Sequence, residues 1–166
     1  MLTHTGTIVL KFMLHISRRS PSKSVQTLID MAAIWPERLL ALVGPDSAEV
    51  QAHQARVKAL GLHNVRFFTD VNESQKTWLY AHCDAFLFPS LMEGFGLPPI
   101  EAMFFGKPVI VARRTSLPEI CGEGAAYWDD FEPESMRRIT QTWIDRHLAH
   151  KAWATRARQQ AERYTW

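Results

Sequence analysis

Residues 85–112 read AFLFPSLMEGFGLPPIEAMFFGKPVIVA, and this stretch decides the fold. It opens with four apolar residues, 85–88, followed by a proline, which is typical of a buried strand. A helix is expected over 98–105, because proline suits the first turn of a helix and Gly106 suits its end. The segment 108–112 is apolar again and predicts a second strand. Two wholly apolar strands joined by a helix indicate a parallel β-α-β unit.

The same alternation continues on both sides of this stretch. Further strands are expected at 8–16, 39–43, 65–68 and 125–128, with helices at 24–34, 46–60, 73–81 and from 133 to the end. Asn72 and Gln75 have the spacing of a capping box before one of these helices. Right-handed crossovers between such strands give a doubly wound, Rossmann-like parallel sheet of about six strands, so the expected fold class is α/β.

Composition and charge narrow the class of protein. The chain has 166 residues, of which 46% are apolar and 22% charged, enough for one sizeable core. A net charge of only +2 gives no reason to expect a nucleic-acid partner. No apolar run reaches the roughly 18 residues of a membrane span, and the N-terminus lacks a secretory cleavage signature. Cys83 and Cys121 form no CxxC motif, which fits a reducing cytosol. We therefore expect one soluble cytoplasmic domain.

Positive charge is concentrated near the C-terminus. The segment 137–163 holds seven basic and two acidic residues. Such a segment either touches anionic lipid headgroups at the membrane surface or forms an ordinary solvated helix face.

In a doubly wound sheet, ligands bind where the strands end, so the loops 17–23, 44–47, 69–72, 89–98 and 113–119 are the places to look for a site. The loop 89–98 is the richest. Its glycines allow positive φ angles and a close approach of the backbone to a ligand. The helix that follows offers free N–H groups and a positive dipole end to an anion, and a phosphate fits best.

Two carboxylates flank this turn. Glu93 precedes the glycines and Glu101 follows the prolines, and the intervening Gly-Phe-Gly and Pro-Pro prevent one helix from holding both. They either clamp a polyhydroxyl ligand or serve as capping and solubilising groups. His15, two residues before the first loop, either reaches the site or is a buried, hydrogen-bonded core imidazole. No D-x-D motif or His, Cys and Asp cluster has metal-ligand spacing, so no metal is expected.

These residues also match a known family. The run 93–103, which begins with Glu93 and has Glu101 eight positions later, resembles the E-x7-E segment of retaining glycosyltransferases of family 4, which have the GT-B fold. The resemblance continues through 106–110 and the SLPEI run at 116–120.

The resemblance extends upstream and covers essentially the whole chain. The loop 17–23 is similar to the family pattern G-R-x4-K, with Arg18 and Lys23 at the matching positions. Ser17 and Ser24 stand where the family commonly has glycine, so the backbone approaches phosphate less closely there.

The resemblance implies specific roles. Arg18 and Lys23 would neutralise the diphosphate of a nucleotide-sugar donor, such as a UDP- or GDP-sugar, and Glu93 would bind hydroxyls of the donor sugar; these three are the expected catalytic set. Glu101 would bind the ribose hydroxyls, and Thr69 would lie along the nucleobase. The backbone of four consecutive residues would hold phosphate and sugar oxygens: Gly94, Phe95, Gly96 and Leu97.

The resemblance also implies a domain organisation. Enzymes of this architecture pair two Rossmann-like domains, with the donor mostly on the C-terminal one. Residues 1–166 would be that single GT-B C-terminal domain, without the N-terminal acceptor domain, which a preceding segment or partner chain would supply. The implied activity is retaining transfer of a hexose in cell-surface polysaccharide or glycolipid synthesis, in the cytoplasm or at the inner face of the membrane. The isolated domain would be inactive.

Two other functions are compatible with the same residues. One is a sugar-nucleotide 2-epimerase-like domain, which shares the GT-B-like fold but requires acid and base residues between two domains. The other is a non-catalytic nucleotide-sugar-binding or assembly module.

Overall fold

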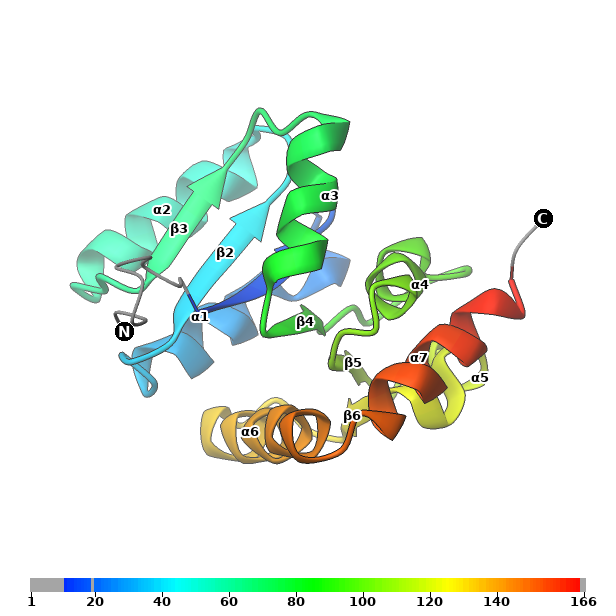
Figure 1. Ribbon diagram of the computed structural model, residues 1–166. Helices are drawn as coiled ribbons and strands as arrows, with labels where there is room; N and C mark the ends of the chain where they lie inside the picture. The colour runs from blue at the N-terminus through cyan, green and yellow to red at the C-terminus, as the bar shows by residue number, and fades with distance from the viewer. Residues whose placement is uncertain (1–10, 19, 165–166) are drawn as a thin grey trace, which may run out of the picture.

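The computed structural model describes residues 11–18 and 20–164 (Figure 1). Within them, six strands form one sheet in the order β3-β2-β1-β4-β5-β6, and all neighbouring strands are parallel. The strands are β1 (Phe12–Ile16), β2 (Leu39–Val43), β3 (Val65–Phe68), β4 (Ala85–Phe88), β5 (Val109–Ala112) and β6 (Ala126–Trp128). The expected α/β class and doubly wound sheet are confirmed. The part of the first strand expected over 8–10 lies outside the described residues.

Helices connect the strands at nearly every position that the sequence predicts. They are α1 (Val25–Ala33), α2 (Ala48–Ala59), α3 (Glu73–His82), α4 (Leu97–Phe104), α5 (Leu117–Cys121), α6 (Pro133–Ala149) and α7 (Ala152–Glu162), with short 3-10 turns at Pro21–Lys23 and Gly122–Gly124. Helix α5 was not expected, because its five residues are too few to show a helical repeat of apolar positions. The expected capping box is present: Asn72 accepts from the Gln75 amide at 2.8 Å, and Gln75 accepts from the Asn72 amide at 2.9 Å.

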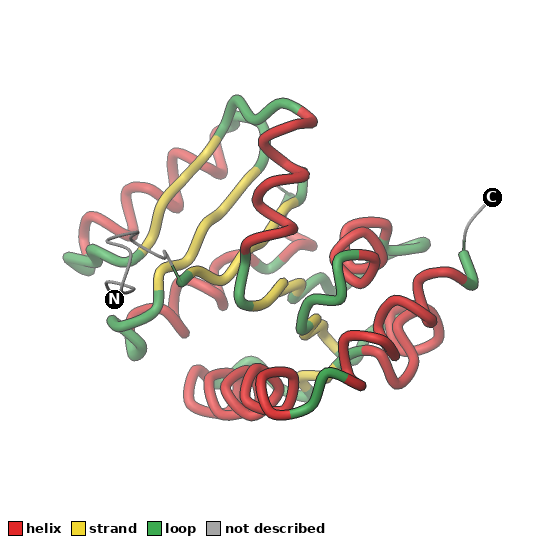
Figure 2. The backbone as a smooth tube through the Cα atoms, in the orientation of Figure 1, coloured by secondary structure: helices red, strands yellow, loops and turns green. Residues whose placement is uncertain are grey.

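The sheet lies between two layers of helices, as Figure 2 shows. Alternate residues of each strand enter different cores, because successive side chains point to opposite faces. Leu14 and Phe86 pack with residues of α3, α4, α5 and α7, whereas Met13 and Leu87 pack with residues of α1 and α6. Both faces of the sheet are therefore buried, which explains strands that are apolar throughout.

The segment of concentrated positive charge, 137–163, forms most of α6 and all of α7. Among the described residues, no helix combines the length and the apolar composition needed to cross a membrane.

The two glycines of the loop before α4 are not equivalent. Gly96 is the N-cap of α4 with φ of 92°, and a Cβ atom placed there would lie 2.9 Å from Cδ2 of Leu117. Gly94 does not have positive φ, and a Cβ atom on it would meet no atom within 4 Å. The backbone therefore requires glycine at position 96, as expected, and does not require it at position 94.

We expect Gly96→Ala to lower the free energy of unfolding by about 1–3 kcal/mol, because alanine is strained at positive φ and would crowd Leu117. Gly94→Ala is the matched control and should change it by less than about 0.5 kcal/mol. Urea unfolding followed by circular dichroism measures both values. Equal losses in the two variants would contradict the distinction.

His147, near the end of α6, makes the stability of the protein depend on pH. Its side chain lies edge-on to Trp143, with ring centroids 5.3 Å apart. Burial lowers its pKa from 6.5 to about 4, because the charged imidazolium is poorly solvated there. Between these two pH values the unfolded chain binds a proton that the folded chain does not, so the free energy of unfolding falls as the pH falls.

We therefore expect His147→Gln to lose less stability than the parent protein when the pH is lowered from about 6.5 to about 4. Urea midpoints across this pH range measure the difference, and the carboxylates common to both proteins cancel in the comparison. Parallel pH profiles would show that His147 does not contribute.

Candidate functional site

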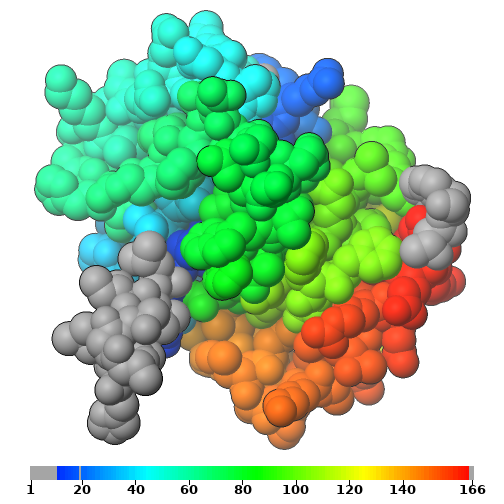
Figure 3. Space-filling view, turned by 45° about the horizontal axis from the view of Figure 1, so that its top comes forward, coloured from blue at the N-terminus to red at the C-terminus, as the bar shows by residue number. Residues whose placement is uncertain are grey.

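The sheet reverses its strand order at β1. This strand has β2 on one side and β4 on the other, and the helices that follow β1 and β4 cover opposite faces. Such a reversal opens a crevice at the carboxyl ends of the strands. The loops after β1 and β4 meet there, where the Leu91 amide donates to the Ser22 carbonyl at 2.8 Å. In the space-filling view the blue loop after β1 lies between the cyan segment after β2 and the yellow-green region of α4 (Figure 3).

A cavity of about 650 Å³ opens at this edge of the sheet, within the range of small-molecule sites. It is lined by the loops after β1, β2 and β3 and by the first turns of α3 and α4. Among the residues expected from the sequence, those lining it are Arg18, Thr69, Leu97 and Glu101. The expected residues outside this lining are Lys23, Glu93, Gly94, Phe95 and Gly96. The site thus has a cavity and, beside it, a second group of polar side chains.

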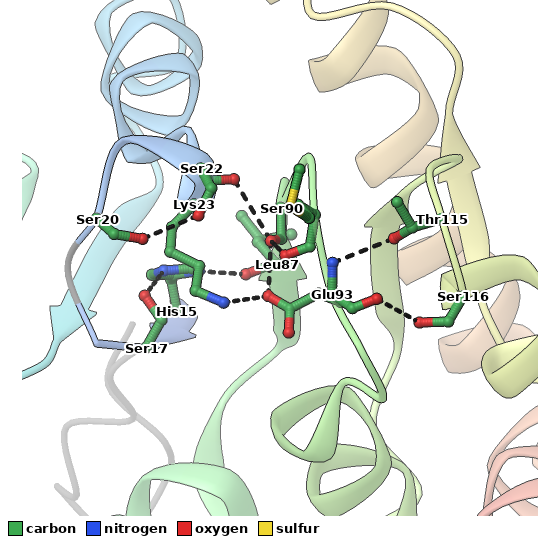
Figure 4. A network of polar contacts seen from close by, with 11 residues as sticks. His15, Ser17, Ser20, Ser22, Lys23, Leu87, Ser90, Glu93, Thr115 and Ser116 are labelled. Atoms are coloured by element: carbon green, nitrogen blue, oxygen red, sulfur yellow. Dashed lines mark hydrogen bonds and ion pairs between the residues drawn. The ribbon is translucent and has the colours of Figure 1, made fainter.

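Glu93 is the centre of that second group (Figure 4). Its Oε1 atom accepts a hydrogen bond from Ser90 Oγ at 2.6 Å and forms an ion pair with Lys23 Nζ. Its amide donates to Thr115 Oγ1 at 3.2 Å, and its carbonyl accepts from Ser116 Oγ at 2.9 Å. Among the described residues, the other carboxylate oxygen, Oε2, has no hydrogen-bond partner. Three loops, after β1, β4 and β5, therefore converge on one glutamate.

The two expected phosphate ligands have different surroundings. Arg18 is exposed at the edge of the cavity, and no carboxylate of the described chain pairs with it. Lys23 is mostly buried and paired with Glu93, and its Nζ lies 5.5 Å from the centre of the Phe88 ring. An ammonium group has three hydrogen-bond donors, so Lys23 can keep Glu93 and still bind an anion. The structure thus brings together Lys23 and Glu93, and leaves Arg18 open to a ligand.

Glu101 faces the cavity from the first turns of α4. Its Oε2 accepts a hydrogen bond from the Tyr80 hydroxyl at 2.7 Å, and its Oε1 lies 3.8 Å from Lys76 Nζ. Burial, and then the nearby Glu101 carboxylate, raise the pKa of Tyr80 far above its ordinary value, so this hydroxyl remains a donor. No sequence pattern indicates Tyr80 or Lys76, since both come from α3 and reach Glu101 only in the folded chain.

The start of α4 offers fewer donors than expected. Leu97, Pro98 and Pro99 are its first three residues, and proline has no N–H group. The amides of Gly96 and Leu97 remain for an anion, together with the helix dipole. The Phe95 side chain makes a T-shaped contact with the Tyr164 ring, with centroids 5.3 Å apart, so only its backbone is a candidate for the expected role.

The loop after β1 is built on polar side chains. His15 is fully buried, with Nδ1 at 2.8 Å from the Leu87 carbonyl oxygen and Nε2 at 2.7 Å from Ser17 Oγ. It is the hydrogen-bonded core imidazole, so the alternative in which it reaches the site is wrong. Ser24 has φ of 51°, a left-handed conformation that glycine adopts more easily. Among the described residues, no three His, Cys, Asp or Glu side chains gather in a way that could hold a metal ion.

Comparison with known proteins gives this arrangement a context. The model of the family "Glycosyl transferases group 1" matches residues 10–160. The serotype-specific mannosyltransferase WbdA of Escherichia coli is 29% identical over 164 residues, which cover 94% of this chain and 20% of WbdA. O-antigen chain mannosyltransferase B of Escherichia coli is 35% identical over 103 residues, or 61% of this chain and 27% of that protein.

Among solved structures, Anabaena HepE in complex with UDP and glucose resembles this chain with a TM-score of 0.81 and 27% identity. The similarity covers 93% of this chain and 44% of HepE. The chain therefore spans about a fifth of WbdA and less than half of HepE.

The ion pair between Lys23 and Glu93 should contribute to the free energy of unfolding. Their side chains are only 18% and 12% exposed, so Lys23→Met leaves a largely buried carboxylate with Ser90 alone. We expect this variant to lose about 1–3 kcal/mol of unfolding free energy, and Lys23→Met with Glu93→Gln to lose less.

Arg18→Met is the matched control, because Arg18 is exposed and pairs with no carboxylate of the described chain; its change should stay within about 0.5 kcal/mol. Urea unfolding of the parent protein, Lys23→Met, Glu93→Gln, the double variant and the Arg18→Met control measures the coupling. Additive losses from the Lys23 and Glu93 substitutions would contradict it.

Proposed function

The chain belongs to the glycosyl transferases group 1 family, and from that premise we propose that it is the donor-binding half of a retaining hexosyltransferase. The observation that carries the proposal is the position of Arg18 and Glu101 in one cavity, directly beside the paired Lys23 and Glu93. Together these residues offer cations for a diphosphate and carboxylates for hydroxyl groups, which are the chemical parts of a nucleotide sugar.

The nucleoside part fits the cavity. The Glu101 carboxylate, oriented by Tyr80, would accept hydrogen bonds from the two ribose hydroxyls. Thr69 would lie along the nucleobase, and it also borders a second, apolar hollow of about 440 Å³ between β3 and α3. Exposed Phe68 in that hollow provides a flat surface of the kind on which aromatic bases stack.

The diphosphate and the sugar fit the crevice between β1 and β4. Arg18, Lys23 and the amides of Gly96 and Leu97 would surround the phosphate oxygens, and Glu93 Oε2 would bind sugar hydroxyls. During transfer, the bond from the anomeric carbon to the phosphate oxygen breaks, and its electron pair stays on that oxygen. An acceptor hydroxyl then bonds to the carbon on the same face, and its proton passes to the departing phosphate oxygen. Lys23 and Arg18 would stabilise the charge that develops on the diphosphate, with no metal ion required.

The acceptor and the rest of the active site would come from a second, N-terminal domain or a partner chain. The coverage of WbdA and HepE supports this, since each is more than twice as long as this chain. The relatives named as mannosyltransferases, WbdA and O-antigen chain mannosyltransferase B, support mannose as the hexose and surface polysaccharide or glycolipid as the product. The chain alone would bind donor and transfer little sugar.

Titration calorimetry of the 166-residue chain with UDP, GDP and their hexose derivatives tests the proposal. We expect binding of at least one nucleoside diphosphate, weakened about tenfold or more by Lys23→Ala and by Glu101→Ala, because each removes a charge-assisted contact.

Lys58→Ala on α2 and Asp145→Ala on α6 are matched controls and should bind as the parent protein does. Circular dichroism of every variant ensures that folded proteins are compared. A folded parent protein that binds none of these nucleotides would overturn the proposal, and full binding by the two site variants would remove these residues from it.

A further inference from the structure

We propose that Thr115 and Ser116 are positioning residues, which fix the distance between Glu93 and the donor sugar. The proposal rests on the proposed function and extends it to the loop after β5. Two consecutive hydroxyl groups hold the two sides of Glu93: Thr115 Oγ1 accepts from its amide at 3.2 Å, and Ser116 Oγ donates to its carbonyl at 2.9 Å (Figure 4). Holding both peptide groups of one residue fixes its Cα atom and the direction of its side chain.

The backbone of Thr115 is strained, which points to a function. Its φ is 47°, and only one other non-glycine described residue, Ser24, has positive φ. For a β-branched residue such a conformation is a genuine outlier. Strain of this kind persists where the surroundings require it, and it is concentrated at functional sites. Here the left-handed turn brings the Thr115 hydroxyl to the Glu93 amide.

The loop that carries these hydroxyls is firmly attached at both ends. The Arg113 amide donates to the Trp128 carbonyl at 2.9 Å, which ties the loop to β6. Leu117, directly after Ser116, is fully buried and packs against Gly96. The loop after β5 is therefore a fixed support, and Glu93 takes its position from it.

The carboxylate of Glu93 is used on one side only. Ser90 and Lys23 hold Oε1, while Oε2 has no hydrogen-bond partner among the described residues. Oε2 is therefore the atom available to a sugar hydroxyl, and its reach depends on where the main chain of Glu93 is held. Small displacements of such a group weaken binding strongly.

In the proposed binding mode, the nucleotide contacts residues outside the loop after β5. The effects of substitutions in that loop on sugar binding and on nucleotide binding can therefore be measured separately. Arg18 and Glu101 line the cavity from the loop after β1 and from α4, and neither forms a hydrogen bond with Thr115 or Ser116. Loss of the Thr115 hydroxyl should therefore weaken binding of the sugar part and leave binding of the nucleoside diphosphate unchanged.

The experiment compares the affinity for a nucleoside diphosphate with the affinity for its sugar derivative, by calorimetry on the 166-residue chain. Thr115→Val keeps the branched shape and the strain but removes the hydroxyl, and Thr115→Ser keeps the hydroxyl. Thr115→Gly removes the hydroxyl and the strain together, so it should fold at least as well as Thr115→Val. Thr142→Val on α6 is the matched control.

The sugar factor is the affinity for the nucleotide sugar divided by the affinity for the nucleoside diphosphate. We expect the same sugar factor in the parent protein, in Thr115→Ser and in Thr142→Val. In Thr115→Val and Thr115→Gly this factor should fall about tenfold, with the affinity for the diphosphate alone unchanged. Amide hydrogen exchange at Glu93 should be faster in both. If Thr115→Gly is stably folded but its sugar factor is lower, the loss comes from positioning of Glu93 and not from a loss of structure.

Three results would overturn the inference. An unchanged sugar factor in Thr115→Gly would exclude a positioning role, as would a parent protein that binds the diphosphates but gains nothing from any sugar; both leave nucleotide binding by the chain in place. A parent protein that binds no nucleotide would overturn this inference together with the proposed function.

Discussion

The parallel pairing of β1 with β2 on one side and β4 on the other is the constraint on which the site depends. Because helices after β1 and β4 must cover opposite faces of the sheet, the two loops separate above it and leave room for a ligand. An ion pair then connects the two loops. Lys23 comes from one loop and Glu93 from the other, although the loops are far apart in the chain. The fold creates the crevice, and this pair links the two loops on either side of it.

The fold was largely predictable because its signals are local. Wholly apolar strands, the capping box at Asn72 and the glycines after helices each depend on a few neighbouring residues, and the structure has them where the sequence indicates. The exceptions are also local in origin. Helix α5 has only five residues, too few for a helical pattern, and the conformation of Gly94 cannot be distinguished from that of Gly96 by residue type.

The candidate site was predictable only in part. Glu93, Glu101, Arg18 and Lys23 were found because their residue types and spacing match a motif. Their partners were not found. Tyr80 reaches Glu101 from another helix, and Thr115 reaches Glu93 from the loop after β5. These contacts arise from the packing of elements distant in the sequence, which no spacing rule encodes.

Ser24 and Thr115 share an unusual backbone conformation, but only one of them is tied to the site by a side-chain contact. They are the non-glycine residues with positive φ in the described chain, and each adjoins a member of the central ion pair: Ser24 follows Lys23, and Thr115 binds the amide of Glu93. Glycine would relieve the strain at either position. At Thr115, glycine would also remove the hydroxyl that holds Glu93, so the hydrogen bond to Glu93 is kept only together with the strained backbone. Ser24 has no such compensation, because its side chain caps neither the preceding turn nor α1. The same backbone geometry is therefore tied to the site at Thr115 and belongs to the turn alone at Ser24.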